Sequence, residues 1–373
     1  MAMFPPSIPH TFIRWLTNEN DVVYDPFSGR GTTAFEASLL GRVAYASDLN
    51  PLASVLSGAK ISTPRRWEVR RRLRGLRSTL KASRISGEPE YIRVLFAKDT
   101  LRQLLWLRET LDREDRVDRF ILAMLLGVLH RNAGKQGVAR GLTVAMPNTF
   151  SMAPGYVSRY IEEHELKPPD VDVIAFLEDR LDKYELGDDL AGRKRGFIWE
   201  QDAGRPVVGP VRKNKAKLIF TSPPYLQAIL YGKFNWIRLW LLGEQPRAVD
   251  RSLFTSTSPK KYEAFMSNTI RNLSKCLRPD GYLCFVVGDV CKGDKQINLA
   301  RRVAKHRAAA DLALLATVRD QLPAQHKVSR IWGKKRGQAT KVDRIVIMGG
   351  PRARLPRTLP EINWDAEEAY AYG

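Results

Sequence analysis

DVVYDPFSGRGTTAFEASLLG, residues 21–41, is the stretch that decides the fold. Its first seven residues, DVVYDPF, are typical of a short buried strand, and the turn SGRGTT separates them from the helical stretch AFEASLLG. Gly29 and Gly31 let the backbone turn tightly and approach a ligand closely. The stretch therefore predicts a strand, a ligand-binding loop and a helix, the repeating unit of a mainly parallel sheet.

More strands are expected along the chain, and helical patterns separate some of them. They cover residues 43–46, 197–200, 217–221 and 282–287, with a closing pair at 313–319 and 342–348. A helix over 262–276, ended by the turn RPDG, is expected before the strand at 282–287. We therefore expect an α/β fold with a mainly parallel sheet and an antiparallel edge hairpin.

Residues 61–195 have a different character. Apolar residues recur every three or four positions over 100–111, 118–131, 156–166 and 171–186, with charged residues between them. This pattern predicts a large helical insertion between two parts of the core, 1–60 and 196–350, with a tail at 351–373. Its apolar side chains are expected to form a core and not to contact a cofactor.

A surplus of 21 positive charges distinguishes the chain, which has 61 Lys and Arg residues against 40 acidic ones. Such a surplus favours polyanionic partners, with nucleic acid first among them, over a merely solvated basic surface. Residues 65–84 hold nine Lys or Arg and one acid, Glu68, while the basic residues 130–140 include no acid. Both stretches lie in the expected insertion.

The remaining composition indicates an ordinary globular protein. Hydrophobic residues make up 44% of the chain, and no apolar run is long enough to span a bilayer. We expect a cytoplasmic protein. The three cysteines, Cys276, Cys284 and Cys291, have no metal-binding spacing and no nearby histidines, so they are expected to be reduced core thiols, and no metal site is expected.

The segment TSPPY, residues 221–225, follows the expected strand at 217–221. Two prolines stiffen the turn and cannot donate to a neighbouring strand. They would leave the Ser222 hydroxyl and the Pro223 carbonyl free to accept hydrogen bonds, while Tyr225 offers a flat aromatic face. An ordinary proline-rich strand exit with a buried tyrosine is the alternative.

Together, DPFSGRGTT and TSPPY resemble the motifs of the S-adenosylmethionine-dependent DNA amino-methyltransferases, specifically the cytosine-N4 group. The resemblance covers about residues 1–60 and 196–350 and implies a Rossmann-like class I methyltransferase fold. It implies that Asp25 faces the methionine ammonium of the cofactor, that Asp48 accepts from the ribose and that Asp202 accepts from the adenine amino group. The full implied cofactor set is Asp25, Phe27, Gly29, Gly31, Thr32, Thr33, Asp48 and Asp202.

The same resemblance implies that Ser222, Pro223, Pro224 and Tyr225 form the catalytic segment. Its reaction is direct methyl transfer to the N4 amine of a cytosine turned out of the duplex. No covalent step is expected, because none of the cysteines follows a proline or stands at the position of Ser222. Many family members carry these two motifs in the reverse order, so the target-recognition region is assigned here to the long insertion between them.

Several alternatives remain open from the sequence. Adenine N6 is a second target amine, because a serine can both donate and accept, and RNA is a second substrate. The chain could also be a nucleic-acid-binding protein with an inactive core. A further interpretation, a nucleotide-dependent oxidoreductase, is supported only by the glycines of Gly29-x-Gly31-x-x-Ala34.

Double-stranded DNA is the expected partner, with a cognate restriction endonuclease and a second copy of the chain as further possibilities. The insertion could provide a dimerisation surface, and the basic connection 326–341 could clamp DNA. The residues expected to contact DNA are Arg65, Arg66, Arg70, Arg71, Arg74, Lys135, Arg140, Lys334 and Lys335.

Overall fold

The chain consists of two compact units. The structure, a computed structural model, describes residues 4–81, 83–134, 137–138, 141–146, 153–184, 196–226, 230–288, 290–292, 295–320 and 343–356. The core unit comprises Met1–Ile61, Lys194–Ile229 and Phe254–Gly373, and the helical unit comprises Ser62–Arg193 and Leu230–Leu253. Each unit is described by itself below.

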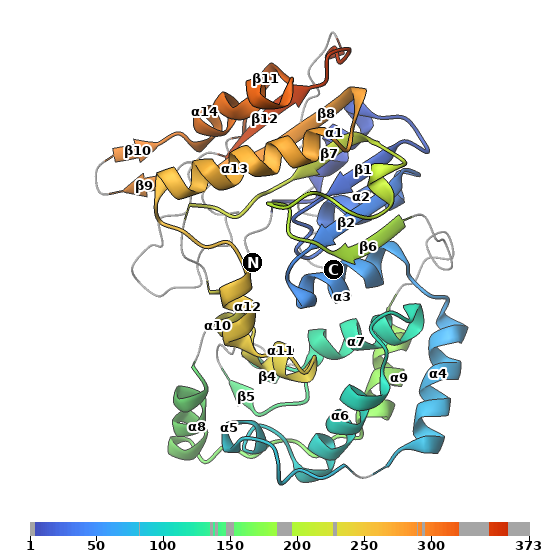
Figure 1. The fold of residues 1–373 in the computed structure, drawn as a ribbon. Helices are drawn as coiled ribbons and strands as arrows, with labels where there is room; N and C mark the ends of the chain where they lie inside the picture. The colour runs from blue at the N-terminus through green and yellow to red at the C-terminus, as the bar shows by residue number, and fades with distance from the viewer. Residues whose placement is uncertain are drawn as a thin grey trace. The chain divides into compact units, whose positions relative to one another are not determined.

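A seven-stranded sheet forms the centre of the core unit (Figure 1). Its strand order is β11-β12-β8-β7-β1-β2-β6, and β12 runs antiparallel to both of its neighbours while the other pairs are parallel. The strands are β1 (Val22–Asp25), β2 (Val43–Asp48), β6 (Gly196–Glu200), β7 (Ala216–Thr221), β8 (Leu277–Gly288), β11 (Ala313–Asp320) and β12 (Asp343–Gly349). This α/β arrangement confirms the expected mainly parallel sheet with an antiparallel edge.

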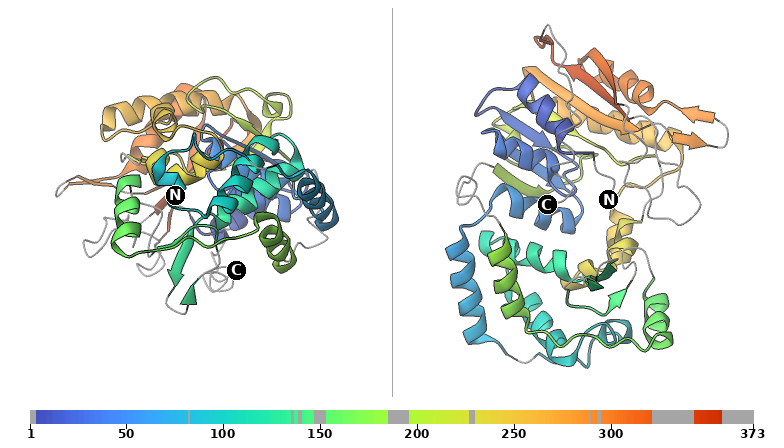
Figure 2. Two further views of the ribbon diagram at one scale, coloured as in Figure 1. Left: turned by 90° about the horizontal axis from the view of Figure 1, so that it is seen from below. Right: turned by 180° about the vertical axis from the view of Figure 1, so that it is seen from behind.

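Helices cover both faces of this sheet (Figure 2). They are α1 (Ser7–Leu16), α2 (Thr32–Leu39), α3 (Pro51–Ile61), α13 (Pro259–Ser274) and α14 (Leu299–Ala304), with 3-10 turns at Pro210–Arg212 and Lys305–Ala310. Alternate residues of each strand point to opposite faces, so Val23 and Leu218 pack in one core with α1 and α2. Tyr24 and Ile219 pack in the other core with α13 and α14.

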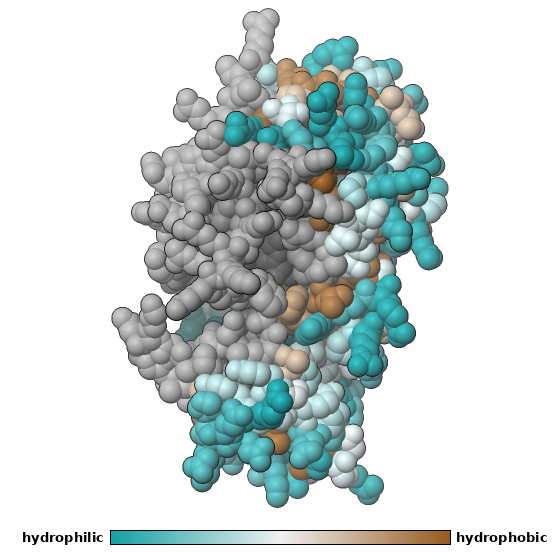
Figure 3. All heavy atoms as spheres, turned by 90° about the vertical axis from the view of Figure 1, so that its left-hand side faces the viewer, coloured by the Kyte–Doolittle hydropathy of each residue, from teal (hydrophilic) through white to brown (hydrophobic). Residues whose placement is uncertain are grey.

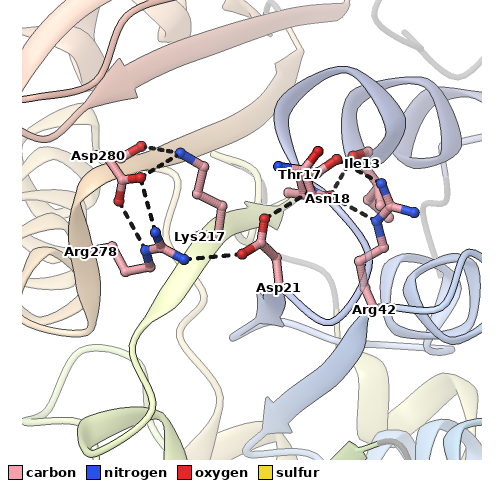
Figure 4. Close-up of polar contacts among 8 residues, drawn as sticks. All are labelled: Ile13, Thr17, Asn18, Asp21, Arg42, Lys217, Arg278 and Asp280. Carbon is pink, nitrogen blue, oxygen red and sulfur yellow. Dashed lines mark hydrogen bonds and ion pairs between the residues drawn. The ribbon is translucent and has the colours of Figure 1, made fainter.

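Polar contacts tie the amino ends of the central strands together (Figure 4). Arg278, at the start of β8, pairs with Asp21 at 3.0 Å and with Asp280 at 2.9 Å. Lys217 of β7 donates to Asp280 at 3.0 Å, and Asp21 accepts from the backbone N–H of Asn18 at 2.8 Å. These contacts lie at the opposite rim of the sheet from the DPFSGRGTT and TSPPY segments.

Arg42 makes a second polar connection at the same rim. Its guanidinium donates to the Thr17 carbonyl at 2.6 Å, to the Thr17 hydroxyl at 3.0 Å and to the Leu40 carbonyl at 2.6 Å. Arg42 is buried, and burial lowers the pKa of its guanidinium. The arginine therefore satisfies the end of α1 and the turn after α2, where backbone carbonyls lack partners within their own helices.

The helical unit contains mostly short and medium helices. They are α4 (Arg66–Thr79), α5 (Glu90–Arg93), α6 (Lys98–Thr110), α7 (Arg116–Val128), α8 (Pro154–Glu163), α9 (Val173–Lys183), α10 (Tyr231–Phe234), α11 (Trp236–Leu241) and α12 (Pro246–Ser252). Short strands β3 (Arg131–Gly134), β4 (Gly137–Val138) and β5 (Ala145–Met146) join them. The expected amphipathic helices within residues 100–186 are present, with ends shifted by a few residues.

Leu230–Leu253 belongs to the helical unit, although the sequence placed it in the second part of the core. Trp240 explains this placement, because its indole N–H donates to Glu88 at 2.6 Å and its ring stacks on Phe96. Arg238 donates to the Leu126 carbonyl at 3.0 Å. The segment after TSPPY therefore completes the core of the insertion, a long-range packing that periodicity does not reveal.

Three smaller features also bear on the sequence predictions. The RPDG residues 278–281 lie inside β8 and not in a separate turn. The start of the expected tail is anchored, because the Tyr282 hydroxyl donates to the Arg354 carbonyl at 2.6 Å. Cys276 and Cys284 are buried free thiols, as predicted, and burial raises the pKa of both.

The surface of the described residues is largely hydrophilic, in agreement with the many charged residues of the sequence. Hydrophilic residues cover much of the coloured face in Figure 3, and apolar residues occur there in small groups. Among the described helices, none combines the length and the apolar character that crossing a membrane requires.

Candidate functional site

The two sequence motifs meet at the carboxyl edge of the sheet. The strands β1 and β7 pair in parallel, with Val23 opposite Leu218 and Tyr24 opposite Ile219. This register brings the strand ends together, so the Thr221 hydroxyl donates to the Asp25 carboxylate at 2.6 Å. Both side chains are buried, with exposed fractions of 0% and 3%. Segments almost 200 residues apart in the sequence thus form one site.

Burial strongly affects the Asp25 carboxyl group. Loss of hydration raises its pKa to about 7, although hydrogen bonds from the Thr221 hydroxyl and the Phe27 N–H oppose the rise. A carboxylate buried beside hydroxyl and amide donors, without a cationic partner among the described residues, is suited to receive a positively charged group from a ligand.

The loop between β1 and α2 depends on its glycines. Gly29 and Gly31 adopt left-handed backbone angles, with φ of +53° and +78°. A Cβ atom at Gly31 would lie 2.8 Å from both the Cα and the Oγ of Ser57. Ser57 also holds the loop, since its hydroxyl donates to Ser28 Oγ at 3.2 Å. Only glycine therefore fits the close approach of this loop to α3.

Asp48 stands at the end of β2 and supports the same loop. One carboxylate oxygen accepts from the Gly29 N–H at 2.9 Å, and the other accepts from the Asn50 N–H at 2.9 Å. Burial raises the pKa of Asp48 to about 6. Each carboxylate oxygen has a second lone pair, so Asp48 can bind hydroxyl groups of a ligand while it holds the loop.

Asp202 follows β6, the strand next to β2. Its carboxylate accepts from the Gly204 N–H at 2.8 Å, and its side chain is 34% exposed. The backbone N–H of Gln201 donates to the Asp48 carbonyl at 3.1 Å, which joins the two strand ends. Asp25 and Asp48 thus end β1 and β2, and Asp202 lies just after β6, so the three lie at the ends of neighbouring strands, as expected for a ligand along the carboxyl edge.

The TSPPY segment leaves β7 as an irregular turn. The Ser222 hydroxyl donates to the Tyr225 hydroxyl at 3.1 Å, so its lone pairs remain available to accept. Pro223 is buried, whereas Ser222, Pro224 and Tyr225 are partly exposed. The turn can therefore present acceptors to a ligand at the edge occupied by Asp25.

The expected DNA-contacting arginines divide into two groups. Arg66 and Arg70 of α4 contact Asp182 of α9, and Arg66 also donates to the Tyr184 carbonyl, so both help to hold the helical unit together. Arg65, Arg71 and Arg74 are exposed. Lys135, Arg140, Lys334 and Lys335 lie outside the described residues.

Sequence reasoning missed two residues of the site. Thr221 was quoted in the motif but given no role, although its position at the end of a central strand could have indicated contact with the neighbouring strand end. Ser57 lies on α3, and no sequence signal marked it. In the described part of the chain, no group of three or more His, Cys, Asp or Glu side chains is arranged to hold a metal ion.

Comparison with known families agrees with the loop and strand geometry. Residues 1–53 match the N6/N4 DNA methylase family. The match includes β1, the glycine loop, α2 and β2, and it ends within α3 before the TSPPY segment. No curated protein matches the chain.

Solved structures show more distant likenesses. TrmN from Thermus thermophilus has a TM-score of 0.35 and 11% identity, over 92% of this chain and 48% of its own length. The rRNA methyltransferase AviRa from Streptomyces viridochromogenes has a TM-score of 0.32 and 10% identity, over 94% and 87%. A proposed DNA modification methylase from Thermus thermophilus has a TM-score of 0.23 and 19% identity, over 41% and 58%. The present chain thus spans about half the length of TrmN.

Replacing Gly31 by alanine is expected to destabilise the protein by about 1–3 kcal/mol, because the new methyl group meets the Ser57 backbone at a left-handed φ. Gly75→Ala is the matched control. Gly75 lies inside α4 with open space around it, so this change should stabilise by up to about 1 kcal/mol. Urea unfolding followed by circular dichroism measures the free energy of unfolding of both variants. Equal changes in that free energy would contradict the assigned role of Gly31.

The unliganded protein is expected to lose stability as the pH rises from about 4 to 7. Asp25 has a folded pKa raised to about 7, so the folded state holds its proton in this range while the unfolded state has released it. Asp25→Asn should flatten this part of the profile, since an amide can still accept from Thr221. Urea unfolding at several pH values compares the two proteins, and parallel profiles would refute a buried, weakly acidic Asp25.

Proposed function

We propose that this chain is an S-adenosylmethionine-dependent DNA methyltransferase that transfers a methyl group to the exocyclic N4 amine of cytosine. The observation that carries the proposal is the contact between Thr221 and Asp25. It brings the segment suited to a cofactor and the segment suited to an amine to the same sheet edge. The N-terminal match to the DNA methylase family supports the substrate class.

The residues at the sheet edge fit the chemical groups of the cofactor. The buried carboxylate of Asp25 suits an ammonium group, and the second lone pairs of Asp48 suit ribose hydroxyls. Gly29 leaves partly exposed backbone without a side chain, as close contact with the methionine part requires, and Gly31 lets the loop lie against α3. When bound, the cofactor would supply an activated methyl group. Phe27 of the same loop, and Thr32 and Thr33 at the start of α2, are assigned to this cofactor site as well.

The TSPPY turn would orient the amine that receives the methyl group. An exocyclic amine is a weak nucleophile because its lone pair is delocalised into the ring. Acceptors at its N–H groups, Ser222 Oγ and the Pro223 carbonyl, would hold the nitrogen in line with the methyl group and stabilise positive charge that develops on it. Pro224 keeps the turn rigid, and the Tyr225 ring would stack on the base.

Adenine N6 is the second candidate target, because the matched family includes both N6 and N4 enzymes. The serine at position 222 favours cytosine through the motif resemblance. Such a modification would protect host DNA from a restriction endonuclease that reads the same site, so we also propose a role in a restriction-modification system.

The helical unit would contribute to DNA binding through the outer face of α4. Trp67, with 52% of its surface exposed, lies under the Arg71 guanidinium at 4.9 Å. Arg74 lies one turn further along, on the same face, and neither Arg71 nor Arg74 has an ion-pair partner among the described residues. Residues three and four apart on a helix are about 5–6 Å apart, so this face presents a row of charges to phosphates.

Methyl transfer can be tested with unmethylated genomic DNA of mixed composition, labelled cofactor and analysis of the nucleosides by mass spectrometry. We expect N4-methylcytosine. Ser222→Ala should lower kcat about 100-fold through loss of an acceptor, and Tyr225→Ala should lower kcat/KM about 10-fold or more.

Ser274→Ala is the control. The hydroxyl of this α13 serine donates to the Arg271 carbonyl, and its loss should leave the rate unchanged. Methyl groups found only as N6-methyladenine would overturn the choice of cytosine. Tight DNA binding without any cofactor binding would show that the protein binds DNA but is not a methyltransferase.

Removing two charges from α4 should weaken DNA binding and its dependence on salt. Arg71→Ala combined with Arg74→Ala should reduce the slope of log affinity against log salt by about 2, because each lost phosphate contact accounts for about 0.9. Arg102→Ala, which removes a partly exposed arginine paired with Asp99 on α6, is the control. Fluorescence anisotropy of a labelled duplex between about 50 and 200 mM salt measures the slope. The same slope in all proteins would exclude α4 as a phosphate-binding surface.

A further inference from the structure

Five exposed cations gather at the amino rim of the sheet in the core unit, on the side covered by α13. They come from the segment that leads into β7 and from the end of α13, and we call them the rim cluster: Arg212, Lys213, Lys215, Arg271 and Lys275. The two segments are joined directly after Lys215 and Lys275, because the Ala216 N–H donates to the Cys276 carbonyl at 2.8 Å. Residues from distant parts of the sequence therefore form one basic surface.

The backbone that carries the first three cations is anchored. Val211, in the 3-10 turn just before them, is fully buried and lies in the same core cluster as Leu273 of α13. The Asn214 side-chain amide donates to the Tyr45 hydroxyl at 3.3 Å, which ties the segment to β2. The cations on either side of Asn214 are thus held at the rim by the core and by the sheet.

A buried thiol shows that the two segments act on the same place. Burial raises the pKa of Cys276 to about 11, and the positive charges of Lys215, Arg212 and Lys275 oppose this rise. Cations from both segments therefore lie close enough to influence one side chain between them.

Other cations at this rim have acidic partners. Arg278 pairs with Asp21 and with Asp280, and Lys217 pairs with Asp280 (Figure 4). By contrast, no member of the rim cluster makes an ion pair with an acidic side chain in the part of the chain that the structure describes. Like charges that are held together repel one another, and an anion bound against them would remove this repulsion.

The dipole of α13 explains only part of the cluster. Cations are favourable at the carboxyl end of a helix, which accounts for Arg271 and Lys275. However, these two are also four residues apart, where like charges disfavour a helix. Lys213 and Lys215 precede a strand and gain nothing from a helix end. Their position is therefore better explained by a polyanion outside the protein.

We propose that the rim cluster binds the phosphate backbone of a second DNA duplex, at the rim opposite Asp25 and Ser222. The proposal rests on the proposed function for the identity of the polyanion. Duplex DNA carries one negative charge per about 1.7 Å of its axis, so it can place several phosphates against a group of cations. The duplex is also stiff over about 150 base pairs, so a short duplex at the carboxyl edge does not bend round to the amino rim. One protein would thus hold two DNA segments and could pass between them.

Isothermal titration calorimetry tests the proposal with a duplex of about 12 base pairs, slightly more than one helical turn, at about 100 mM salt. The wild-type protein should bind two duplexes per chain. Lys213→Gln combined with Lys215→Gln removes two exposed charges and should leave one duplex per chain. Lys275→Gln, on the other segment, should weaken binding of the second duplex and lower its salt slope by about 0.9.

Arg102→Gln combined with Lys183→Gln is the matched control, because it removes two cations that are paired with Asp99 and Asp179. This variant should still bind two duplexes. Thermal unfolding checks that each variant is folded, and Lys275→Gln carries the test if the double variant is not.

The outcomes separate this proposal from the proposed function. One duplex per wild-type chain, with N4-methylcytosine still formed, would overturn the second site and leave the proposed function intact. Two duplexes per chain in the wild type and in every variant, with unchanged affinity, would also overturn it. Two duplexes in the wild type without any methyl transfer would overturn the proposed function alone. A structured RNA that displaces the second duplex more readily than duplex DNA does would overturn the assignment to DNA.

Discussion

Parallel pairing of β1 with β7 is the constraint on which the rest of the site depends. In a parallel pair the two carboxyl ends lie at the same rim, so Asp25 and Thr221 become neighbours through register alone. The polar contacts of Asp21, Lys217 and Arg278 hold the opposite ends of the strands. The opposite rim, at the carboxyl ends of the strands, carries loops and acceptors that a ligand can use.

The burial of Asp25 makes binding of a positively charged ligand group more favourable. Its carboxylate is poorly solvated when ionised, which is why its pKa rises to about 7. A ligand ammonium would replace the missing solvation and lower that pKa again. Binding of such a ligand should therefore strengthen as the pH rises towards 7, whereas the stability of the unliganded protein weakens, and both trends come from one carboxyl group.

Short-range patterns revealed the core but not the long-range packing. The strand, glycine loop and helix around Gly29 were predictable because periodicity and turn chemistry act within about twenty residues. The helical unit was only partly predictable. Its helices have clear apolar stripes, yet the attachment of Trp240 to Glu88 depends on residues 152 positions apart. Likewise, the sequence predicted that Arg66 and Arg70 contact DNA, whereas the fold places Asp182 beside both of them.

A neutral acceptor at Ser222 is consistent with the chemistry of the TSPPY turn. An amine nitrogen that attacks a methyl group gains positive charge and must later lose a proton. A hydroxyl and a carbonyl can accept hydrogen bonds from that nitrogen without becoming protonated, and water can then take the proton. Since Ser222 donates its own hydrogen to Tyr225, its lone pairs are oriented for this role before any base arrives. In the proposed reaction, the hydrogen bond between these two side chains would therefore connect placement of the base with placement of the acceptor.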